Sequence, residues 1–183
     1  RSGDLASILT SLEPGDILFI DEIHRLNKNV EEALYPAMED FNLDIVLGKG
    51  PGARTLRLDL NPFTIIGATT KAGAISSPLR DRFGLVHRLT YYSANDLEKI
   101  IKDASTVLGI KLDTDSAKEI AKRSRGTARI ALKLLRRVRD YCLIEHESKP
   151  NLDLTQKCLK FYQVDDAGLD ETDRALLEAI IKL

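Results

Sequence analysis

The pattern of apolar and polar positions predicts a mixed α/β half followed by an all-helical half. Two short apolar runs, at 17–20 and 63–66, predict strands that are buried on both faces, as in a parallel sheet. Between them, apolar residues recur at helical spacing over 30–41. Two further runs, at 43–47 and 55–60, flank a stretch rich in glycine, and this arrangement predicts a β-hairpin inserted between the two buried strands.

After residue 92 the pattern is helical throughout. Amphipathic spacing predicts helices at 93–108, 114–124, 127–146, 154–161 and 170–183, and one more at 2–12, before the first strand. We therefore expect three parts: a mixed α/β part over 1–92, a helical module over 93–166, and the start of a further part over 167–183.

Composition places the chain among ordinary globular proteins. Hydrophobic residues make up 43% of the chain and charged residues 30%, and the net charge of −1 gives no general attraction to nucleic acids. No apolar run reaches the ~20 residues of a membrane span, so no membrane partner is expected. Cys142 and Cys158 have no metal-ligand spacing, and we interpret them as reduced thiols of a cytoplasmic protein.

Two acids, Asp21 and Glu22, directly follow the first predicted strand. Open α/β sheets bind their ligands at the carboxyl ends of strands. The first acid suits a Mg²⁺ ion that bridges nucleotide phosphates, and the second suits the polarisation of an attacking water, which is the Walker B arrangement. The alternative is a strand that ends in acids only because its end faces solvent. The phosphate-binding pattern G-x-x-x-x-G-K-S/T occurs nowhere in these residues.

Side chains that suit phosphate chemistry follow the second predicted strand. Because neighbouring parallel strands end at one edge of a sheet, a hydroxyl of Thr69 or Thr70 is placed to hold the attacking water or to contact a γ-phosphate. Both threonines would equally suit a loop turn. Arg80 and Arg82 come next, and the planar arginine fork suits a phosphoryl transition state. A surface network with Asp81 is the alternative.

Arg129 lies in the first turn of a predicted helix. A positive charge there opposes the helix dipole, and a bound anion would explain it. The alternative is an exposed arginine on a basic helix face.

The second hairpin strand has a leucine face that includes Leu56 and Leu58. The alternation places these side chains on one side of the ribbon. That side either contacts a partner protein or packs on the core of the chain itself, and the pattern favours neither.

The order of these features resembles an AAA+ ATPase, and five segments resemble the RuvB family of motors that drive branch migration of Holliday junctions. The segments are 19–26, 34–40, 67–70, 77–84 and 134–140, and the resemblance covers essentially the whole chain. It implies the α/β class and the P-loop NTPase fold, as an AAA+ core with a partial parallel sheet and an inserted β-hairpin. An all-helical lid would follow over 93–166, and 167–183 would start a winged-helix DNA-binding domain.

The resemblance also implies roles for individual residues. The catalytic ones are Asp21 as the Mg²⁺-binding Walker B acid, Glu22 as the base, Thr70 as sensor 1 with Thr69 as the nearest alternative, and Arg82 as an arginine finger that reaches a neighbouring subunit. The other ATP contacts are Arg129 as sensor 2, Tyr92, Glu39, Asp40 and Phe41. The family usually has proline before the sensor 2 arginine, and this chain has Ala128.

Cofactors and partners follow from the same resemblance. It implies ATP and Mg²⁺, a homo-hexameric ring, Holliday junction DNA, RuvA docked on the Leu56 and Leu58 face, and RuvC through the junction complex.

Two alternative functions stay open at this point. A clamp-loader-type AAA+ ATPase shares the acids, threonines and arginines, although the segment 34–40 argues against it. A non-catalytic adaptor would keep the AAA+ fold without a phosphate loop. Because the chain starts without methionine and lacks that loop, we expect a fragment that is inactive alone. A Gly-Lys-Thr loop upstream of Asp21 in the gene would favour the motor.

Overall fold

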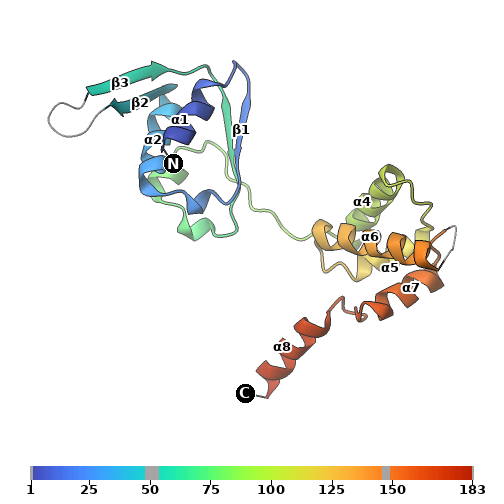
Figure 1. Cartoon of the computed structure of the whole chain (residues 1–183). Coiled ribbons are helices and arrows are strands. Elements are labelled where there is room, and N and C mark those ends of the chain that lie inside the picture. Colours follow the sequence, from blue (N-terminus) through green and yellow to red (C-terminus); the bar gives the residue numbers. More distant parts are fainter. Residues whose placement is uncertain (1, 48–53, 146–148, 183) are drawn as a thin grey trace. The chain divides into compact units, whose positions relative to one another are not determined.

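The computed structural model describes residues 2–47, 54–145 and 149–182, in two compact units, Arg1–His87 and Arg88–Leu183 (Figure 1). The elements of the first unit are α1 (Ser2–Thr10), β1 (Ile17–Ile20), η1 (Ile23–Arg25), α2 (Lys28–Glu39), β2 (Asn42–Leu47), β3 (Arg54–Asp59), β4 (Thr64–Gly67), η3 (Ala72–Ala74) and α3 (Ser77–Asp81).

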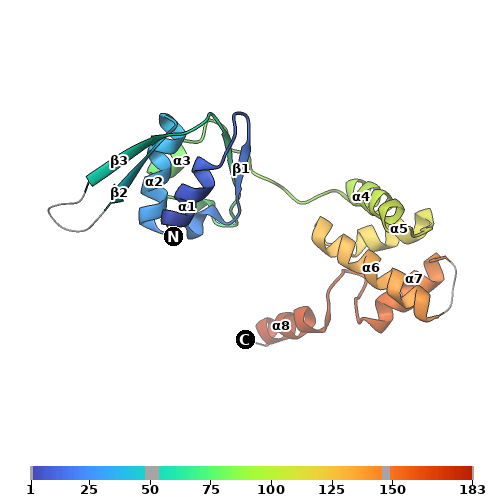
Figure 2. The same cartoon turned by 45° about the horizontal axis from the view of Figure 1, so that its top comes forward.

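The strands form a parallel pair and a hairpin. β1 pairs with β4 in parallel, with Ile17 opposite Thr64 and Ile20 opposite Gly67. The antiparallel pair β2 and β3 lies between them in chain order and extends beyond α1 and α2 in Figures 1 and 2. This confirms the predicted α/β class with an inserted hairpin. The predicted glycine-rich turn at 48–52 lies outside the described residues.

The prediction that the parallel strands are buried on both faces is wrong for this chain. Leu18, Ile20 and Ile65 pack against the core under α1 and α2. On the opposite face, Ile17 and Phe19 of β1 are 63% and 59% exposed, and Ile66 of β4 is 45% exposed. The physical reason is that, in the described part of the chain, the core cluster around α1 and α2 covers one face of the pair.

The second unit consists of helices around one apolar core. They are α4 (Ala94–Val107), α5 (Thr114–Lys122), α6 (Ala128–Ile144), α7 (Leu152–Phe161) and α8 (Glu171–Ile181). α5 and α6 contact each other, and both contact α4 and α7 (Figure 2). By contrast, α8 has no buried residue. The helix predictions are confirmed, except that the predicted ends at His146 and Leu183 lie outside the described residues. None of the described helices is long and apolar enough to cross a membrane.

We predict that Leu135→Ala lowers the free energy of unfolding of the full-length protein by about 2–5 kcal/mol, as large-to-small changes in cores do. Leu135 is fully buried in the core of the second unit. Urea unfolding followed by circular dichroism measures the change. The matched control is Leu143→Ala in the same helix, where the side chain is 66% exposed and a change within about 0.5 kcal/mol is expected. Equal effects of both variants would contradict the assigned core.

Candidate active site

The two acids lie at the carboxyl end of β1, beside the end of β4. Backbone bonding continues past the sheet: the Ala68 N–H donates to the Ile20 carbonyl and the Ile23 N–H donates to the Ala68 carbonyl, each at 2.9 Å. Between these contacts, Glu22 has a left-handed backbone with φ of 49°. This conformation is uncommon outside glycine and clusters at functional sites.

Thr70 is the direct partner of the Glu22 carboxylate. The Thr70 hydroxyl donates to Glu22 Oε2 at 3.0 Å, and the Thr70 backbone N–H donates to the same oxygen at 3.3 Å. Both hydrogen bonds stabilise the charged carboxylate and so hold the pKa of Glu22 below its ordinary value. The bond from the backbone N–H has the larger effect. The ends of β1 and β4 therefore bring a proton acceptor and a hydroxyl together.

His24 is a member of this site that sequence reasoning missed. Its largely buried side chain places Nδ1 at 2.8 Å from Thr69 Oγ1 and 3.2 Å from Glu22 Oε2. The Thr69 oxygen also accepts the Lys71 N–H at 3.0 Å. Thr69 thus contacts His24, whereas Thr70 contacts Glu22. The only sequence signal for His24 is its position two residues after Glu22.

Gly67, the last residue of β4, is closely packed. A Cβ atom at this position would lie 2.9 Å from Ile23 Cδ1 and 3.2 Å from Phe83 Cζ. Ile23 is buried directly after Glu22, and Phe83 directly follows Arg82. A side chain at Gly67 would therefore require the ends of the Ile23 and Phe83 side chains to move.

Asp21 is the candidate for holding a metal ion. It is exposed at the strand end, and its Oδ1 accepts the Glu22 N–H at 2.9 Å. Mg²⁺ is commonly held by one or two carboxylates together with waters and phosphate oxygens, so a single acid here fits the ion. Within the described residues, no group of three or more His, Cys, Asp or Glu forms a metal site alone. The residues present fit the metal side of a nucleotide site.

Arg82 is held against α2 of its own unit. Its guanidinium carbon lies 4.1 Å from the centre of the Tyr35 ring, and Nη2 lies 3.0 Å from Glu39 Oε1. A third contact is the bond from Nη1 to the Pro78 carbonyl at 2.7 Å. The structure thus brings Arg82 and Glu39 together. Tyr35, which sequence reasoning missed, could have been found from its spacing of four residues from Glu39 on one helix face.

Asp40 and Phe41 form the turn between α2 and β2. Asp40 ends the helix, with its N–H donating to the Pro36 carbonyl at 2.9 Å. Phe41 has a left-handed backbone with φ of 51°, and its ring packs edge-on against Phe63 at 5.9 Å between centroids. Both residues are therefore adjacent in the chain to Glu39, although their side chains are not part of the Arg82 contact.

Tyr92 and Arg129 lie in the second unit, near the first turns of α4 and α6. The Tyr92 N–H donates to the Gly126 carbonyl at 2.8 Å. Gly126 has φ of +73°, and a Cβ atom there would lie 2.7 Å from Tyr91 Cβ, so only glycine fits. Arg129 is exposed and, among the described residues, its side chain has no hydrogen bond or ion pair. The structure therefore places Tyr92 beside the turn that leads to Arg129.

The leucine face of the hairpin changes from buried to exposed along the ribbon. Leu43 is buried opposite Leu58, which is half-buried, and Ile45 packs against the core opposite Leu56. Leu56 is 45% exposed. The base of the face is therefore core, and Leu56 is the leucine of the predicted pair that is available to a partner.

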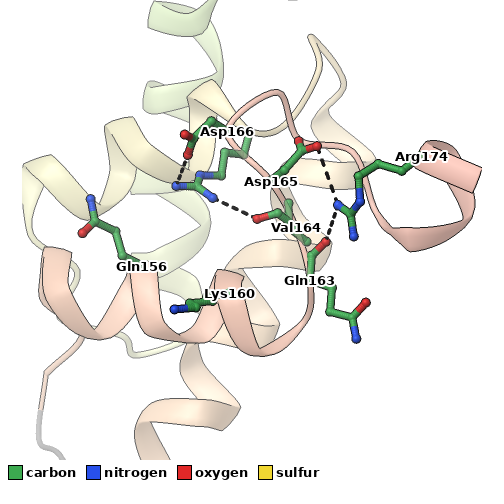
Figure 3. A pocket seen from close by; sticks show the side chains of 8 residues that line it. Gln156, Lys160, Gln163, Val164, Asp165, Asp166 and Arg174 are labelled. Carbon is green, nitrogen blue, oxygen red and sulfur yellow. Dashed lines mark hydrogen bonds and ion pairs between the residues drawn. The ribbon is translucent and has the colours of Figure 1, made fainter. Parts of the chain in front are cut away.

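An open hollow of about 640 Å³ lies in the second unit where α7 meets the turn before α8 (Figure 3). Its arginines are already engaged: Arg123 contacts Asp166 at 2.8 Å and donates to the Val164 carbonyl at 2.9 Å. Arg174 donates to the Gln163 carbonyl at 2.9 Å. These bonds attach α8 and the turn before it to the preceding helices. We therefore interpret the hollow as part of this attachment and not as a ligand site.

Comparisons with known proteins find relatives for both halves of the chain. Residues 1–89 match the RuvB Holliday junction DNA helicase P-loop domain, and residues 92–165 match the RuvB AAA lid domain. The chain is similar to the Thermotoga maritima RuvB Holliday junction branch migration motor, with 47% identity and a TM-score of 0.85 over 100% of this chain and 56% of that one. Two structures of mutants of that RuvB are each 48% identical in sequence to this chain.

The two mutant structures have TM-scores of 0.87 and 0.86 and are again matched over 100% of this chain. The match covers 57% and 56% of their lengths, so the chain spans somewhat more than half of these relatives. Two domain matches in sequence order and nearly half of all positions identical lead to one conclusion. The chain belongs to the RuvB family.

Proposed function

We propose that this chain is part of the motor subunit of an ATP-driven machine that moves Holliday junctions in recombination and repair. The observation that supports it best is the contact between Glu22 and Thr70 at adjacent strand ends. A charged carboxylate bonded to a hydroxyl beside a metal-binding acid suits the hydrolysis of a phosphoanhydride. Membership of the RuvB family indicates which substrates this site would act on, namely ATP and Holliday junction DNA.

In this proposal Glu22 is the general base. Its carboxylate accepts a proton from the attacking water, and the Thr70 hydroxyl orients that water or senses the γ-phosphate. The hydrogen bonds from Thr70 lower the pKa of Glu22 and so favour the ionised form of the base. Asp21 would hold the Mg²⁺ that accompanies ATP, and that ion would supply neutralisation of phosphate charge.

The arginines divide between two subunits of a homo-hexameric ring. Arg82 stabilises the transition state in the site of a neighbouring subunit, together with the 39–41 segment that adjoins it. Because Glu39 contacts Arg82, both belong to one surface. Arg129 and Tyr92, at one end of the helical unit, contact the nucleotide of their own subunit.

We assign the segments as follows. Residues 1–92 are the later part of the AAA+ core, 93–166 are the lid, and 167–183 begin a winged-helix DNA-binding domain. RuvA docks on the hairpin through Leu56, and RuvC joins through the junction complex in the cytoplasm.

The test is branch migration of a synthetic four-way junction by the full-length protein with RuvA and ATP. We predict that Leu56→Asp abolishes the stimulation by RuvA, because a charge would be buried at an apolar contact, while the ATPase of the protein alone stays within about twofold. Leu56 is preferred over Leu58 because Leu58 is half-buried and its replacement would disturb the hairpin base.

The matched control is Thr55→Asp, which places the same charge at the neighbouring exposed position of β3. It faces the other side of the ribbon and is expected to retain RuvA stimulation. Undiminished RuvA binding by Leu56→Asp would reject the docking role. A full-length protein without ATP-dependent junction movement would reject the motor and favour an adaptor.

A further inference from the structure

One face of α2 contacts both ends of α3, the short helix that leads to Arg82. Glu31, Tyr35 and Glu39 follow one another at four-residue spacing and therefore form one stripe along α2. At the start of α3, the Ser76 hydroxyl donates to Glu31 Oε1. At its end, Arg82 is the residue that terminates the helix. The stripe thus fixes the helix at two points.

Tyr35 connects the two points. Its hydroxyl donates to Glu31 Oε1 at 2.7 Å, and its ring lies under the Arg82 guanidinium at 4.1 Å. The hydrogen bond to Glu31 has the largest effect on the pKa of Tyr35 and burial the second largest, and both raise it. The Tyr35 hydroxyl therefore remains a hydrogen-bond donor. A single side chain therefore orients the arginine and is itself oriented by the carboxylate that binds the helix start.

The restraints on Arg82 come from three directions. The Tyr35 ring covers one face of the guanidinium, the Glu39 carboxylate contacts one edge, and the Pro78 carbonyl contacts another. Its Nε atom is buried and has no hydrogen-bond partner among the described residues. An arginine bound on a face and two edges loses most of its rotamer freedom before any ligand is present.

We propose that Tyr35 is a positioning residue for Arg82, which it holds in place before a neighbouring subunit presents its nucleotide. The inference rests on the proposed function of Arg82 as an arginine finger. A side chain of this length otherwise samples many conformations, and ordering it in advance lowers the entropic cost of reaching the transition state. Glu39 acts in the same way from the edge of the guanidinium.

The experiment compares Tyr35→Leu and Tyr35→Phe in the full-length protein. Tyr35→Leu removes the ring and is expected to lower kcat about 10-fold, the order of a desolvated cation–π contact, with little change in the KM for ATP. Tyr35→Phe keeps the ring and is expected to restore most of kcat. A role in folding alone would not give this division between kcat and KM with rescue by phenylalanine.

A second readout is independent of activity. In the full-length protein labelled with ¹⁵N-arginine, the Arg82 Nε–H resonance, assigned by its loss in Arg82→Lys, is expected upfield because of the Tyr35 ring. Tyr35→Phe should retain the shift and Tyr35→Leu should remove it. If Tyr35→Leu does not fold, Glu39→Gln replaces it as the kinetic test, with an expected decrease in kcat of about threefold. Glu32→Gln on the exposed side of α2 is its control.

The outcomes separate this inference from the proposed function. If Arg82→Ala leaves kcat unchanged, the arginine finger itself is wrong, whatever the resonance shows. If Arg82→Ala lowers kcat but Tyr35→Leu leaves kcat unchanged, or the resonance is not shifted, the positioning role of Tyr35 is wrong.

Discussion

Replacing Glu22 with glutamine is expected to lower the rate of ATP hydrolysis by the full-length protein at least ~100-fold, the contribution of a positioned general base. Glutamine has nearly the same shape and can still accept the bonds from Thr70, but its amide cannot take a proton from water. ATP binding should therefore stay within about threefold of wild type, since the phosphate contacts are unchanged. Single-turnover hydrolysis and equilibrium binding of a fluorescent ATP measure the two quantities.

The pH dependence of the wild-type rate follows from the lowered pKa of Glu22. A base acts in its deprotonated form, so its contribution is present above its pKa and is lost as the pH falls through that value. Because the Thr70 bonds lower the pKa below the ordinary value of 4.5, the loss due to Glu22 lies below that pH. In Glu22→Gln this acid limb should be absent.

The control for Glu22→Gln is Glu32→Gln, which makes the same chemical change. Glu32 lies on α2 with a 55% exposed side chain and only a long contact of 3.8 Å to Lys28. It should hydrolyse ATP at the wild-type rate. If Glu22→Gln retained more than a third of the wild-type rate, the base would have to be a different residue.

The second large effect is expected for Arg82→Ala, which should lower kcat by about 10³-fold or more, as the loss of an arginine finger does. Arg82 carries a permanent charge that no neighbouring side chain replaces on removal. Mixing Arg82→Ala subunits with Glu22→Gln subunits should restore part of the activity. In mixed rings some sites combine the intact Glu22 of one subunit with the intact Arg82 of its neighbour.

Arg80→Ala is the matched control for this experiment. Arg80 lies two residues earlier in the same helix, is exposed, and is 3.9 Å from Asp81 in a surface pair. Such pairs contribute little, so its kcat should be close to wild type. Inactive mixtures would contradict action between subunits, and a larger loss for Arg80→Ala than for Arg82→Ala would transfer the role to Arg80.

Much of the fold was predictable because its elements have local patterns. The spacing of Val30, Leu34 and Ala37 predicts α2, and all three are buried there. The alternation of Leu56 and Leu58 predicts the hairpin strand. Exposure of Ile17 and Phe19 was not predictable, since an apolar run describes the strand and not the layers that cover it.

Parts of the candidate site depend on contacts between distant positions. The contact of His24 with Thr69 and the contact of Glu31 with Ser76 each join residues that are 45 positions apart in the sequence. No local periodicity encodes such contacts. Asp21, Glu22, Thr70 and Arg82 were predictable as candidates because their residue types follow strand ends or a loop. Their partner His24 was not, because it lies on a helical turn of ordinary composition. Tyr35 had one local signal, its spacing of four residues from Glu39 on α2.

The attachment of α8 has a mechanical consequence for the second unit. Gly168 in the preceding turn packs against the Arg123 carbonyl so closely that a Cβ atom would lie 2.2 Å from it, which fixes the turn to the helices. By contrast, α8 itself is held by Arg125 to Asp173 at 2.8 Å and by Arg174 to backbone carbonyls, without buried side chains. Interdigitated apolar side chains permit few arrangements, whereas ion pairs re-form at many angles at small cost. The turn before α8 is therefore rigidly attached to the preceding helices, whereas α8 itself is able to change direction while those helices stay in place.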